Sequence, residues 1–499
     1  MTDNILIWSS GPDLYFCMSY YLQKNYDTNL SIIFDVTNRP KSFFEKQKII
    51  NFNKIWFYHD HISKNYVVND RTYLKEFETR FDIDLWKLAI NERFFLPFNE
   101  FHHFTTDEIL SILEQECKLF EKVLANSKPD FFITADPSLH HHRLFYEMCR
   151  KLKIPTLILH PLRIGNKHTI SEEAEVFDPA ILSEFESTHT SAEYLREHYL
   201  FFDRQKQQEE FSNKLNSSSI FLLKAAFSYL FSANSNTRTH YTYFGRNKLK
   251  VIMSYAKVQL KKKYRKRFID QNLTMKPDLD VDFAYLPLHI EMEQYPLITA
   301  PFYTNQIEII KQVAKSLPIG YRLYVKEHPS QGARGWRSIS EYKEIMNIPN
   351  VYVINPSFPS TNLHRNCAFT ITISGSAGLD AAFYEKPSLV FTDLHYSFLP
   401  NVYRIKSIEE ISKIIKRALT TKVSTEQLTK YLQFIEQNSF DFDYIDFLFK
   451  INQTFYKGGF LVDTEISSEQ FLDFLKNNTY TLENIAQMHI KKIQLCKKE

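Results

Sequence analysis

The chain has 499 residues, and its shares of 44% hydrophobic and 24% charged residues exclude disordered and collagen-like proteins. Its 61 Lys and Arg residues are nearly balanced by 58 Asp and Glu residues, so the overall charge does not indicate a nucleic-acid-binding protein. The five cysteines form no C-x-x-C pair, which excludes a disulfide framework and a zinc ribbon and favours a reducing compartment. The N-terminus lacks the features of a signal peptide, and the longest apolar segment, 219–233, is too short to span a bilayer, so we expect a cytoplasmic protein.

Residues 1–178 alternate strand-like and helix-like segments, which is typical of an α/β domain with a parallel sheet. A helix at 105–126 has Thr105 and Glu108 in the positions of a capping box. Apolar runs predict strands at 5–8, 30–36, 55–58, 131–135 and 156–160, and a second helix is predicted at 140–151.

The alternation stops over residues 179–277, where the stretch 246–267 holds ten Lys or Arg residues and no acidic residue. We therefore predict a helical, basic insertion. The alternation resumes over 278–422, which predicts a second α/β domain, and 423–499 has the pattern of a helical C-terminal extension. Two α/β domains predict a cleft between them, because open α/β sheets bind ligands beyond the carboxyl ends of their strands. The strands predicted in the second domain are 283–287, 321–325, 351–354, 369–373 and 389–392.

Two close pairs of glycines, 332/335 and 375/378, lie in the second domain of a chain that has only ten glycines. The second pair separates a predicted strand from a predicted helix. Small residues let a ligand approach the backbone, and the N–H groups and dipole at the start of a helix favour a phosphate. A capped helix after a tight turn is the simpler alternative. The residues predicted to bind a phosphate or a ribose here are Ser374, Gly375, Ser376 and Asp380.

Two further strand ends of the second domain carry polar residues. Lys326, His328 and Pro329 follow one strand, and the histidine could donate a hydrogen bond or a charge to a phosphate. His289 and Glu291 follow another strand and are expected near the same cleft. The alternatives are a strand end closed by proline and a polar loop.

Five motifs follow one another in the second half of the chain: P-L-H-x-E at 287–291, K-E-H-P at 326–329, N-V-x-x-I-x-P at 350–356, I-S-G-S-A-G-L-D-A at 373–381 and E-K-P at 385–387. In this order they resemble the motifs of bacterial surface-polysaccharide glycosyltransferases, above all the capsule-synthesis proteins that include the Kdo transferases. Bacterial sialyltransferases are similar at a greater distance. The resemblance covers residues 280–410 well, is weak over 1–170 and is absent over 180–275 and 425–499.

This resemblance implies a GT-B fold, in which two Rossmann-like domains face a cleft and the C-terminal one holds a nucleotide-sugar donor. His328 would contact the donor phosphate, the segment 374–376 would surround it, and Asp380 stands where the family more often has Glu. The donor would be a CMP-activated acidic sugar such as Kdo or a sialic acid. The acceptor would be a glycan or a lipid-linked glycan, and no cofactor is expected.

The resemblance also implies a catalytic carboxylate in the N-terminal domain, and Asp13 and Asp136 are the two candidates. Their alternatives are a helix cap for Asp13 and a turn residue before a proline for Asp136. Three consecutive histidines, 140–142, point in different directions on a helix and cannot easily share one ion, so we predict no metal. His140 and Arg143 are instead candidates for contacting an acidic acceptor.

The basic stretch 246–267 carries apolar residues at helical spacing, which predicts contact with an anionic membrane surface; a solvated helix face is the alternative. Three other functions stay open. One is the transfer of polyol phosphates from CDP-alcohols, as in teichoic-acid synthesis. Another is a serine hydrolase that uses Ser376 in a G-x-S-x-G-like turn, and the third is nucleic-acid binding through the basic stretch.

Overall fold

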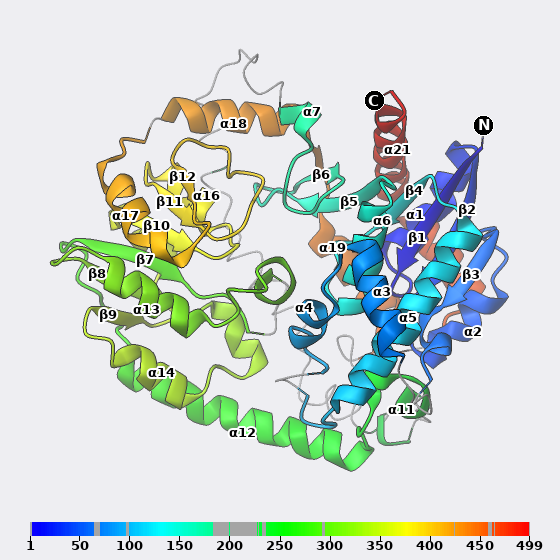
Figure 1. The fold of residues 1–499 in the computed structure, drawn as a ribbon, viewed down its shortest axis with the longest axis horizontal. Helices are drawn as coiled ribbons and strands as arrows, with labels where there is room; N and C mark the ends of the chain where they lie inside the picture. The colour runs from blue at the N-terminus through cyan, green and yellow to red at the C-terminus, as the bar shows by residue number, and fades with distance from the viewer. Residues whose placement is uncertain are drawn as a thin grey trace. The chain divides into compact units, whose positions relative to one another are not determined.

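The computed structural model describes residues 2–63, 70–95, 99–182, 236–291, 295–423, 425–457 and 465–498, with short pieces at 199, 227, 229–231 and 462–463. The chain divides into two compact α/β units (Figure 1). The first comprises residues 1–174, 203–251 and 439–499, and the second comprises 175–202 and 252–438. About half of the predicted insertion, all of it between residues 183 and 235, lies outside the described residues, and the boundaries at 178, 277 and 422 stay a prediction.

The first unit contains a seven-stranded sheet in the order β13-β6-β5-β4-β1-β2-β3. The strands β1 to β5 are parallel, and β6 pairs antiparallel with both β5 and β13. The order β3-β2-β1-β4-β5 is that of a Rossmann-like sheet, with its topological switch point between β1 and β4. The strands are β1 (Asp3–Ser9), β2 (Thr28–Phe34), β3 (Lys54–Phe57), β4 (Phe131–Thr134), β5 (Thr156–Pro161), β6 (Lys167–Ser171) and β13 (Phe440–Asp441).

Both faces of this sheet are buried in hydrophobic cores. Successive side chains of a strand point to opposite faces, so a central strand such as β1 contributes to both cores. Ile5 and Ile7 of β1 pack into one core with the first and last helices of the chain, whereas Leu6 and Trp8 pack into the other. The helices are α1 (Leu14–Asn25), α2 (Asn38–Lys46), η1 (Tyr58–His61), α3 (Arg71–Phe81), α4 (Leu85–Ile90), α5 (Thr106–Ser127), α6 (His140–Lys151), α11 (Asn236–Thr239), η3 (Tyr241–Tyr243), α19 (Tyr444–Phe455), α20 (Ser468–Asn477) and α21 (Thr479–Cys496), beside a hairpin of β14 (Tyr456–Lys457) and β15 (Val462–Asp463).

The end of the chain returns to the first unit, where α21 lies beside α1 (Figure 1). The hydroxyl of Tyr21 donates to the carbonyl of Leu475 at 3.0 Å and lies 2.8 Å from the hydroxyl of Thr479. The predicted capping box of α5 is confirmed, since the Thr105 side chain and Glu108 bond to each other's backbone amides.

The second unit contains a fully parallel six-stranded sheet in the order β12-β11-β10-β7-β8-β9. Counted from β7, this is the Rossmann order 3-2-1-4-5-6, with the switch point between β7 and β10. Two Rossmann-like sheets confirm the predicted α/β fold class of GT-B type. The strands are β7 (Phe283–Pro287), β8 (Arg322–Lys326), β9 (Val351–Ile354), β10 (Phe369–Thr372), β11 (Ser388–Val390) and β12 (Val402–Arg404).

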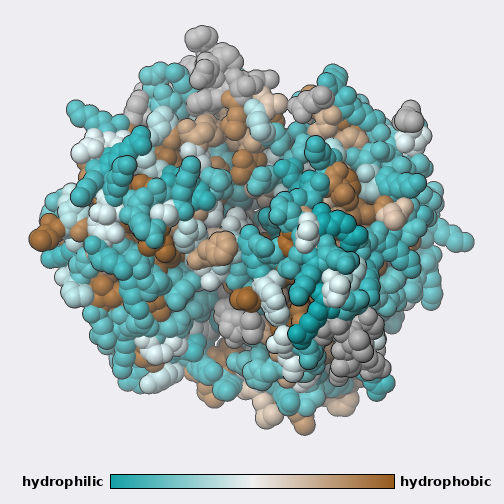
Figure 2. All heavy atoms as spheres, viewed as in Figure 1, coloured by the Kyte–Doolittle hydropathy of each residue, from teal (hydrophilic) through white to brown (hydrophobic). Residues whose placement is uncertain are grey.

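Helices cover both faces of the second sheet, and the predicted basic stretch forms most of α12, whose buried Ile269 packs into the core. No helix in the described parts of the chain is long and apolar enough to cross a membrane. On the face in Figure 2, hydrophobic side chains form small groups among hydrophilic ones. The helices are α7 (Pro179–Leu182), α12 (Lys248–Asn272), η4 (Tyr295–Thr299), α13 (Gln306–Ser316), η5 (Pro329–Arg334), α14 (Ile339–Met346), α15 (Ser360–Asn366), α16 (Ala377–Phe383), η6 (Ile408–Glu410), α17 (Ile411–Thr420) and α18 (Thr425–Gln437).

Candidate functional site

The switch point of the second sheet brings His289, which follows β7, against the glycine loop that follows β10. The amide of Ser374 donates to Nε2 of His289 at 3.4 Å, and the amide of Gly375 donates to Oγ1 of Thr372 at 3.0 Å. A Cβ atom on Gly375 would lie 2.7 Å from that hydroxyl and 3.2 Å from the His289 ring. Only glycine therefore fits at position 375 without a shift of the loop.

The glycine loop differs in one respect from the predicted phosphate-binding loop. The backbone amides of Ser374 and Gly375 already donate hydrogen bonds to protein atoms, so they are not available to a phosphate. The donors that remain are at the start of α16, where Ser376 occupies the N-cap position and makes no side-chain cap hydrogen bond. The hydroxyl of Tyr396 donates to the carbonyl of Gly375 and holds the loop from its other side. The N-terminal end of α16 and the Ser376 hydroxyl are thus the part of the loop that suits an anion.

Lys326 and Asp380, predicted to bind the donor, lie near two linked hydroxyl groups: Lys326 near Ser360, and Asp380 near Tyr285. Lys326 is 2% exposed, its Nζ donates to Oγ of Ser360 at 2.7 Å, and burial lowers its pKa to about 8. The Tyr285 hydroxyl lies 3.4 Å from the same Oγ; burial raises its pKa, and the negative charge of Asp380 adds to that rise. A buried amine with a pKa of about 8 is mostly cationic at neutral pH, which suits contact with a phosphate.

His328 forms the N-cap of η5, and Pro329 is the first residue of that helix. Its Nδ1 accepts a hydrogen bond from the amide of Ser330 at 3.1 Å. Burial, together with the charge of Lys326, lowers its pKa to about 4, so the ring is neutral at pH 7. Because Nδ1 accepts, the ring proton sits on Nε2. His328 can therefore donate one hydrogen bond to a phosphate but adds no charge.

Arg337, which the sequence did not single out, connects the loops after β7 and β8. Its guanidinium bonds to Oε2 of Glu327 at 2.8 Å, to Oε1 of Glu291 at 3.0 Å and to the carbonyl of His289 at 2.5 Å. Burial raises the pKa of Glu291 to about 7, although Arg337 opposes this rise. Glu291, which is 26% exposed, thus pairs with the buried Arg337, which orients the loop carrying His289. No local sequence pattern distinguishes a buried arginine of this kind from an exposed one.

In the first unit, Asp13 follows β1 and Asp136 follows β4, on the two sides of the switch point. The Asp13 carboxylate accepts hydrogen bonds from the amides of Ser10 at 2.7 Å and Phe16 at 3.0 Å, so it caps α1 as its alternative reading predicted. Burial nevertheless raises its pKa to about 6. Burial, followed by the charges of Tyr444, Asp13 and Asp136, also raises the pKa of Tyr15, which places both carboxylates near one side chain.

His140 is completely buried, and its ring bonds to two buried carboxylates. Nδ1 lies 2.8 Å from Oε2 of Glu92, and Nε2 lies 3.0 Å from Oε1 of Glu116. Burial alone would lower its pKa, but the charges and hydrogen bonds of both glutamates raise it to about 10. Arg143, the other predicted acceptor contact, is partly exposed and forms an ion pair with Glu147. The structure gives His140 a place in the protein interior, and its contact with an acceptor stays a prediction.

A buried network of polar side chains extends from Glu116 to the carboxylate of Asp35, which lies at the carboxyl end of β2. Tyr58 bonds to Glu116 and to the hydroxyl of Tyr241 at 3.2 Å, and Tyr241 lies 3.0 Å from Nδ1 of His141. Nε2 of His141 lies 2.9 Å from Asp35. Asp35 directly follows β2, which ends at Phe34. The sequence predicts a longer strand over 30–36, so it does not identify Asp35 as a residue beyond the strand end.

Glu116, His140 and His141 are close enough to hold a metal ion. The hydrogen bonds favour an ion-pair network instead. His140 bonds to Glu92 through Nδ1 and to Glu116 through Nε2, and the charges and hydrogen bonds of these glutamates raise its pKa to about 10. His59 also lies 3.0 Å from Asp35. Burial raises the pKa of Asp35, but the hydrogen bonds and charges of His141 and His59 outweigh burial and hold this pKa well below its usual value. The carboxyl group of Asp35 therefore stays ionised.

Two Rossmann-like units, each with polar side chains at its switch point, define an α/β protein of the GT-B type. Residues 196–433 match the model of the family described as capsule polysaccharide biosynthesis protein. This match confirms the resemblance to capsule-synthesis proteins.

Solved structures of similar architecture are distant in sequence. The chain is similar to the UDP-GlcNAc 2-epimerase of Methanocaldococcus jannaschii solved with UDP-GlcNAc and UDP, with 12% identity over 87% of this chain and 99% of that chain and a TM-score of 0.27. Two KpsC structures from Thermosulfurimonas dismutans are also similar. The β-Kdo 2,7-transferase has 11% identity over 74% and 95% of the chains and a TM-score of 0.29. The β-Kdo 2,4-transferase has 13% identity over 63% and 86% and a TM-score of 0.32. No curated protein matches the chain. Nothing about its reaction follows from likenesses this distant.

Proposed function

We propose that the protein is a metal-independent glycosyltransferase of surface polysaccharide assembly. It transfers a sugar from a nucleotide-sugar donor, a CMP-activated acidic sugar such as Kdo or a sialic acid, to a glycan acceptor. The observation that carries this proposal is the arrangement at the second switch point, where His289 bonds to the Ser374 amide and the loops after β7, β8 and β10 present polar groups. In open α/β sheets this edge is where nucleotides bind.

In this proposal the second unit binds the donor. Nε2–H of His328 donates to the phosphate, Lys326 supplies a positive charge, and the Ser376 hydroxyl with the first amides of α16 completes the binding site. Asp380 accepts hydrogen bonds from the ribose. Arg337 acts through other residues, because it holds the His289 loop in position.

Thermal-shift titration with CMP, CDP, UDP, GDP and dTDP tests the donor site. A nucleotide at 100 times its dissociation constant stabilises the fold by ~2.7 kcal/mol. A shift with CMP alone supports the CMP-sugar donor, and a shift with CDP but not CMP supports the polyol-phosphate alternative. A shift with UDP or GDP keeps the transferase but removes the CMP-sugar. The absence of a shift with all five would overturn the proposal.

The first unit supplies the general base that takes the proton of the acceptor hydroxyl. Asp13 and Asp136 are the two candidates, and the oxygens of Asp13 also accept the hydrogen bonds that cap α1. Replacing Asp136→Asn should abolish sugar transfer and leave nucleotide binding unchanged. Asp107→Asn, at an exposed position of the same unit, is the matched control. Normal turnover of the Asp136 variant would exclude this carboxylate as the base.

We further propose that α12 contacts an anionic membrane surface and brings the enzyme to a lipid-linked acceptor. Leu249, Met253, Leu260 and Tyr264 recur at helical spacing and are 62–70% exposed, with lysines on both sides of this apolar stripe. Replacing Leu260→Gln together with Tyr264→Gln should reduce flotation with phosphatidylglycerol vesicles. Ile90→Gln removes an exposed apolar side chain elsewhere and should have no effect. Equal flotation of all three proteins would refute the contact.

A further inference from the structure

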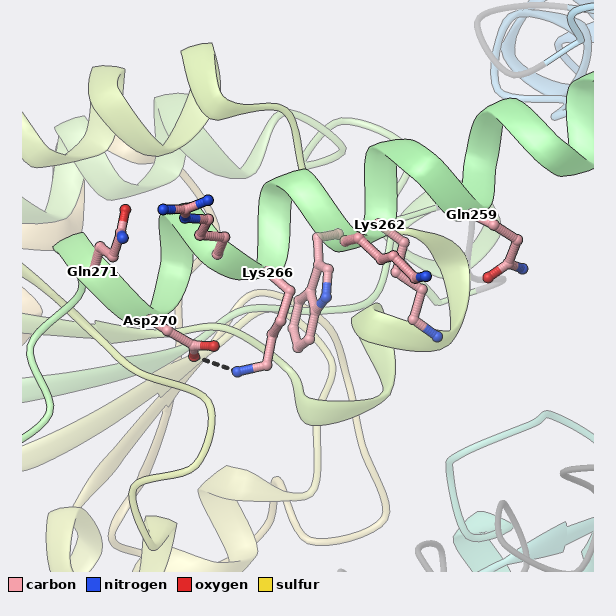
Figure 3. Close-up of a pocket in the computed structure, with 8 residues that line it drawn as sticks. Gln259, Lys262, Lys266, Asp270 and Gln271 are labelled. Carbon is pink, nitrogen blue, oxygen red and sulfur yellow. Dashed lines mark hydrogen bonds and ion pairs between the residues drawn. The ribbon is translucent and has the colours of Figure 1, made fainter.

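An open hollow lies on the second unit, between α12 and the turn that follows η5 (Figure 3). Its volume of about 640 Å³ is within the range of roughly 300–1,000 Å³ that is usual for small-molecule sites. None of its lining residues belongs to the proposed donor site. The side chains that matter here are Lys262, Lys263, Lys266, Arg267 and Trp336.

The lining of this hollow is strongly cationic. Four Lys and Arg side chains of α12 contribute to it, whereas Asp270 is the single acidic residue of the lining and forms an ion pair with Lys266. Like charges on successive turns of a helix repel one another, so an anion in the hollow would relieve this repulsion. The charge therefore selects an anionic ligand.

Trp336 adds a second and independent observation. Its side chain is 8% exposed, and its indole Nε1 is buried without a hydrogen-bond partner among the residues that the structure describes. A buried N–H donor without an acceptor is unfavourable, and such groups are rare in folded proteins. An acceptor oxygen of a ligand in the hollow would satisfy this donor.

The fold holds Trp336 in a conformation that a bulky residue rarely adopts, with φ at +61°. Gly335 before it has φ at +102°, and a Cβ atom on Gly332 would lie 2.6 Å from the indole. Arg265 of α12 donates to the carbonyls of Gly335 and Trp336. The glycine pair 332/335 thus serves to seat the indole beside the basic helix, and strain of this kind concentrates at functional sites.

We propose that this hollow is an anion-binding site, separate from the donor site, that takes the phosphate group of a phosphorylated sugar or of a lipid headgroup. The cations of α12 bind the phosphate, and the indole of Trp336 donates its N–H to a ligand oxygen and covers an apolar face of the ligand. Both sources present the same chemistry, a phosphate beside a partly apolar group.

Tryptophan fluorescence and calorimetry test this site. Glucose 1-phosphate should change the fluorescence of the wild-type protein saturably, and glucose should not. Trp336→Phe should remove this signal. The double variant Lys262→Gln/Lys266→Gln should weaken binding by about tenfold or more, as expected for the loss of charged hydrogen-bond donors. Lys413→Gln/Lys416→Gln, two exposed lysines of α17 in the same unit, is the matched control and should bind as the wild type does.

Vesicles distinguish the two sources of phosphate. If phosphatidylglycerol vesicles change the fluorescence and glucose 1-phosphate does not, the ligand is a headgroup; the reverse result identifies a soluble sugar phosphate. No response to either probe would overturn the proposal, as would normal binding by the Lys262/Lys266 variant. This second readout remains decisive even if Trp336→Phe fails to fold, because both lysines are on the surface helix. Competition by CMP would show that the hollow is not separate from the donor site. Because the donor site is tested with nucleotides and this hollow with glucose 1-phosphate, each proposal can fail without the other.

Discussion

Replacing His140→Gln should destabilise the first unit and change how its stability depends on pH. The imidazole lies between Glu92 and Glu116, at 2.8 and 3.0 Å, and all three side chains are at most 1% exposed. Although burial opposes protonation, the two carboxylates raise the pKa of His140 to about 10. Glutamine removes the charge of the ring and offers one donor nitrogen in place of two.

Two estimates of the loss agree. A pKa raised from 6.5 to about 10 corresponds to ~5 kcal/mol of stability at neutral pH. Removing one partner from a buried ion pair costs ~3–5 kcal/mol. Because the pKa in the folded state lies above that in the unfolded state, this stabilisation is complete below about pH 6.5 and is lost as the pH rises toward 10.

Urea unfolding of the wild type, His140→Gln and the control His103→Gln at pH 6 to 10 measures this dependence; His103 is exposed. The free energy of unfolding of the His140 variant should fall furthest below that of the wild type at pH 6–7. The difference should shrink as the pH approaches 10, and the control should follow the wild type throughout. A difference that is the same at pH 7 and pH 10 would refute a buried imidazolium.

Three further predictions concern the donor site and the packing of the chain end. Gly375→Ala should abolish the thermal shift with CMP, because its Cβ would displace Thr372 or His289; an unchanged shift would contradict the tight loop. The affinity for CMP, measured by calorimetry between pH 6.5 and 9.5, should fall as the pH rises through about 8, where Lys326 loses its charge, and a constant affinity would exclude this lysine from the site. Tyr21→Phe removes the hydrogen bond to Leu475 and should lower the free energy of unfolding by ~1 kcal/mol, with no effect on nucleotide binding.

Much of the secondary structure could be predicted from local patterns. The strand Phe283–Pro287 and the helix His140–Lys151 have the bounds that their sequences indicate. The helix Leu14–Asn25 is indicated only by the alternative role of Asp13 as a helix cap, because buried residues follow one another along it and leave no period of 3.6 residues to detect. The local pattern does not predict the strand Lys167–Ser171, which pairs with the preceding strand β5 on one side and with β13, from a distant part of the chain, on the other.

The sequence by itself determined that the chain has two α/β units and that polar or small residues occupy the loops after β7, β8 and β10. The spacing of hydrophobic residues, the positions of small residues and the ends of strands are local properties of the sequence. The tertiary structure alone decided that Arg337 orients the His289 loop, that His140 lies in the interior and that the last helix packs on the first. It also decided that Trp336 faces the basic helix. These features depend on pairs such as Tyr21 and Leu475, which are 454 positions apart, and the energy of such a contact exists only once the fold has brought both residues together.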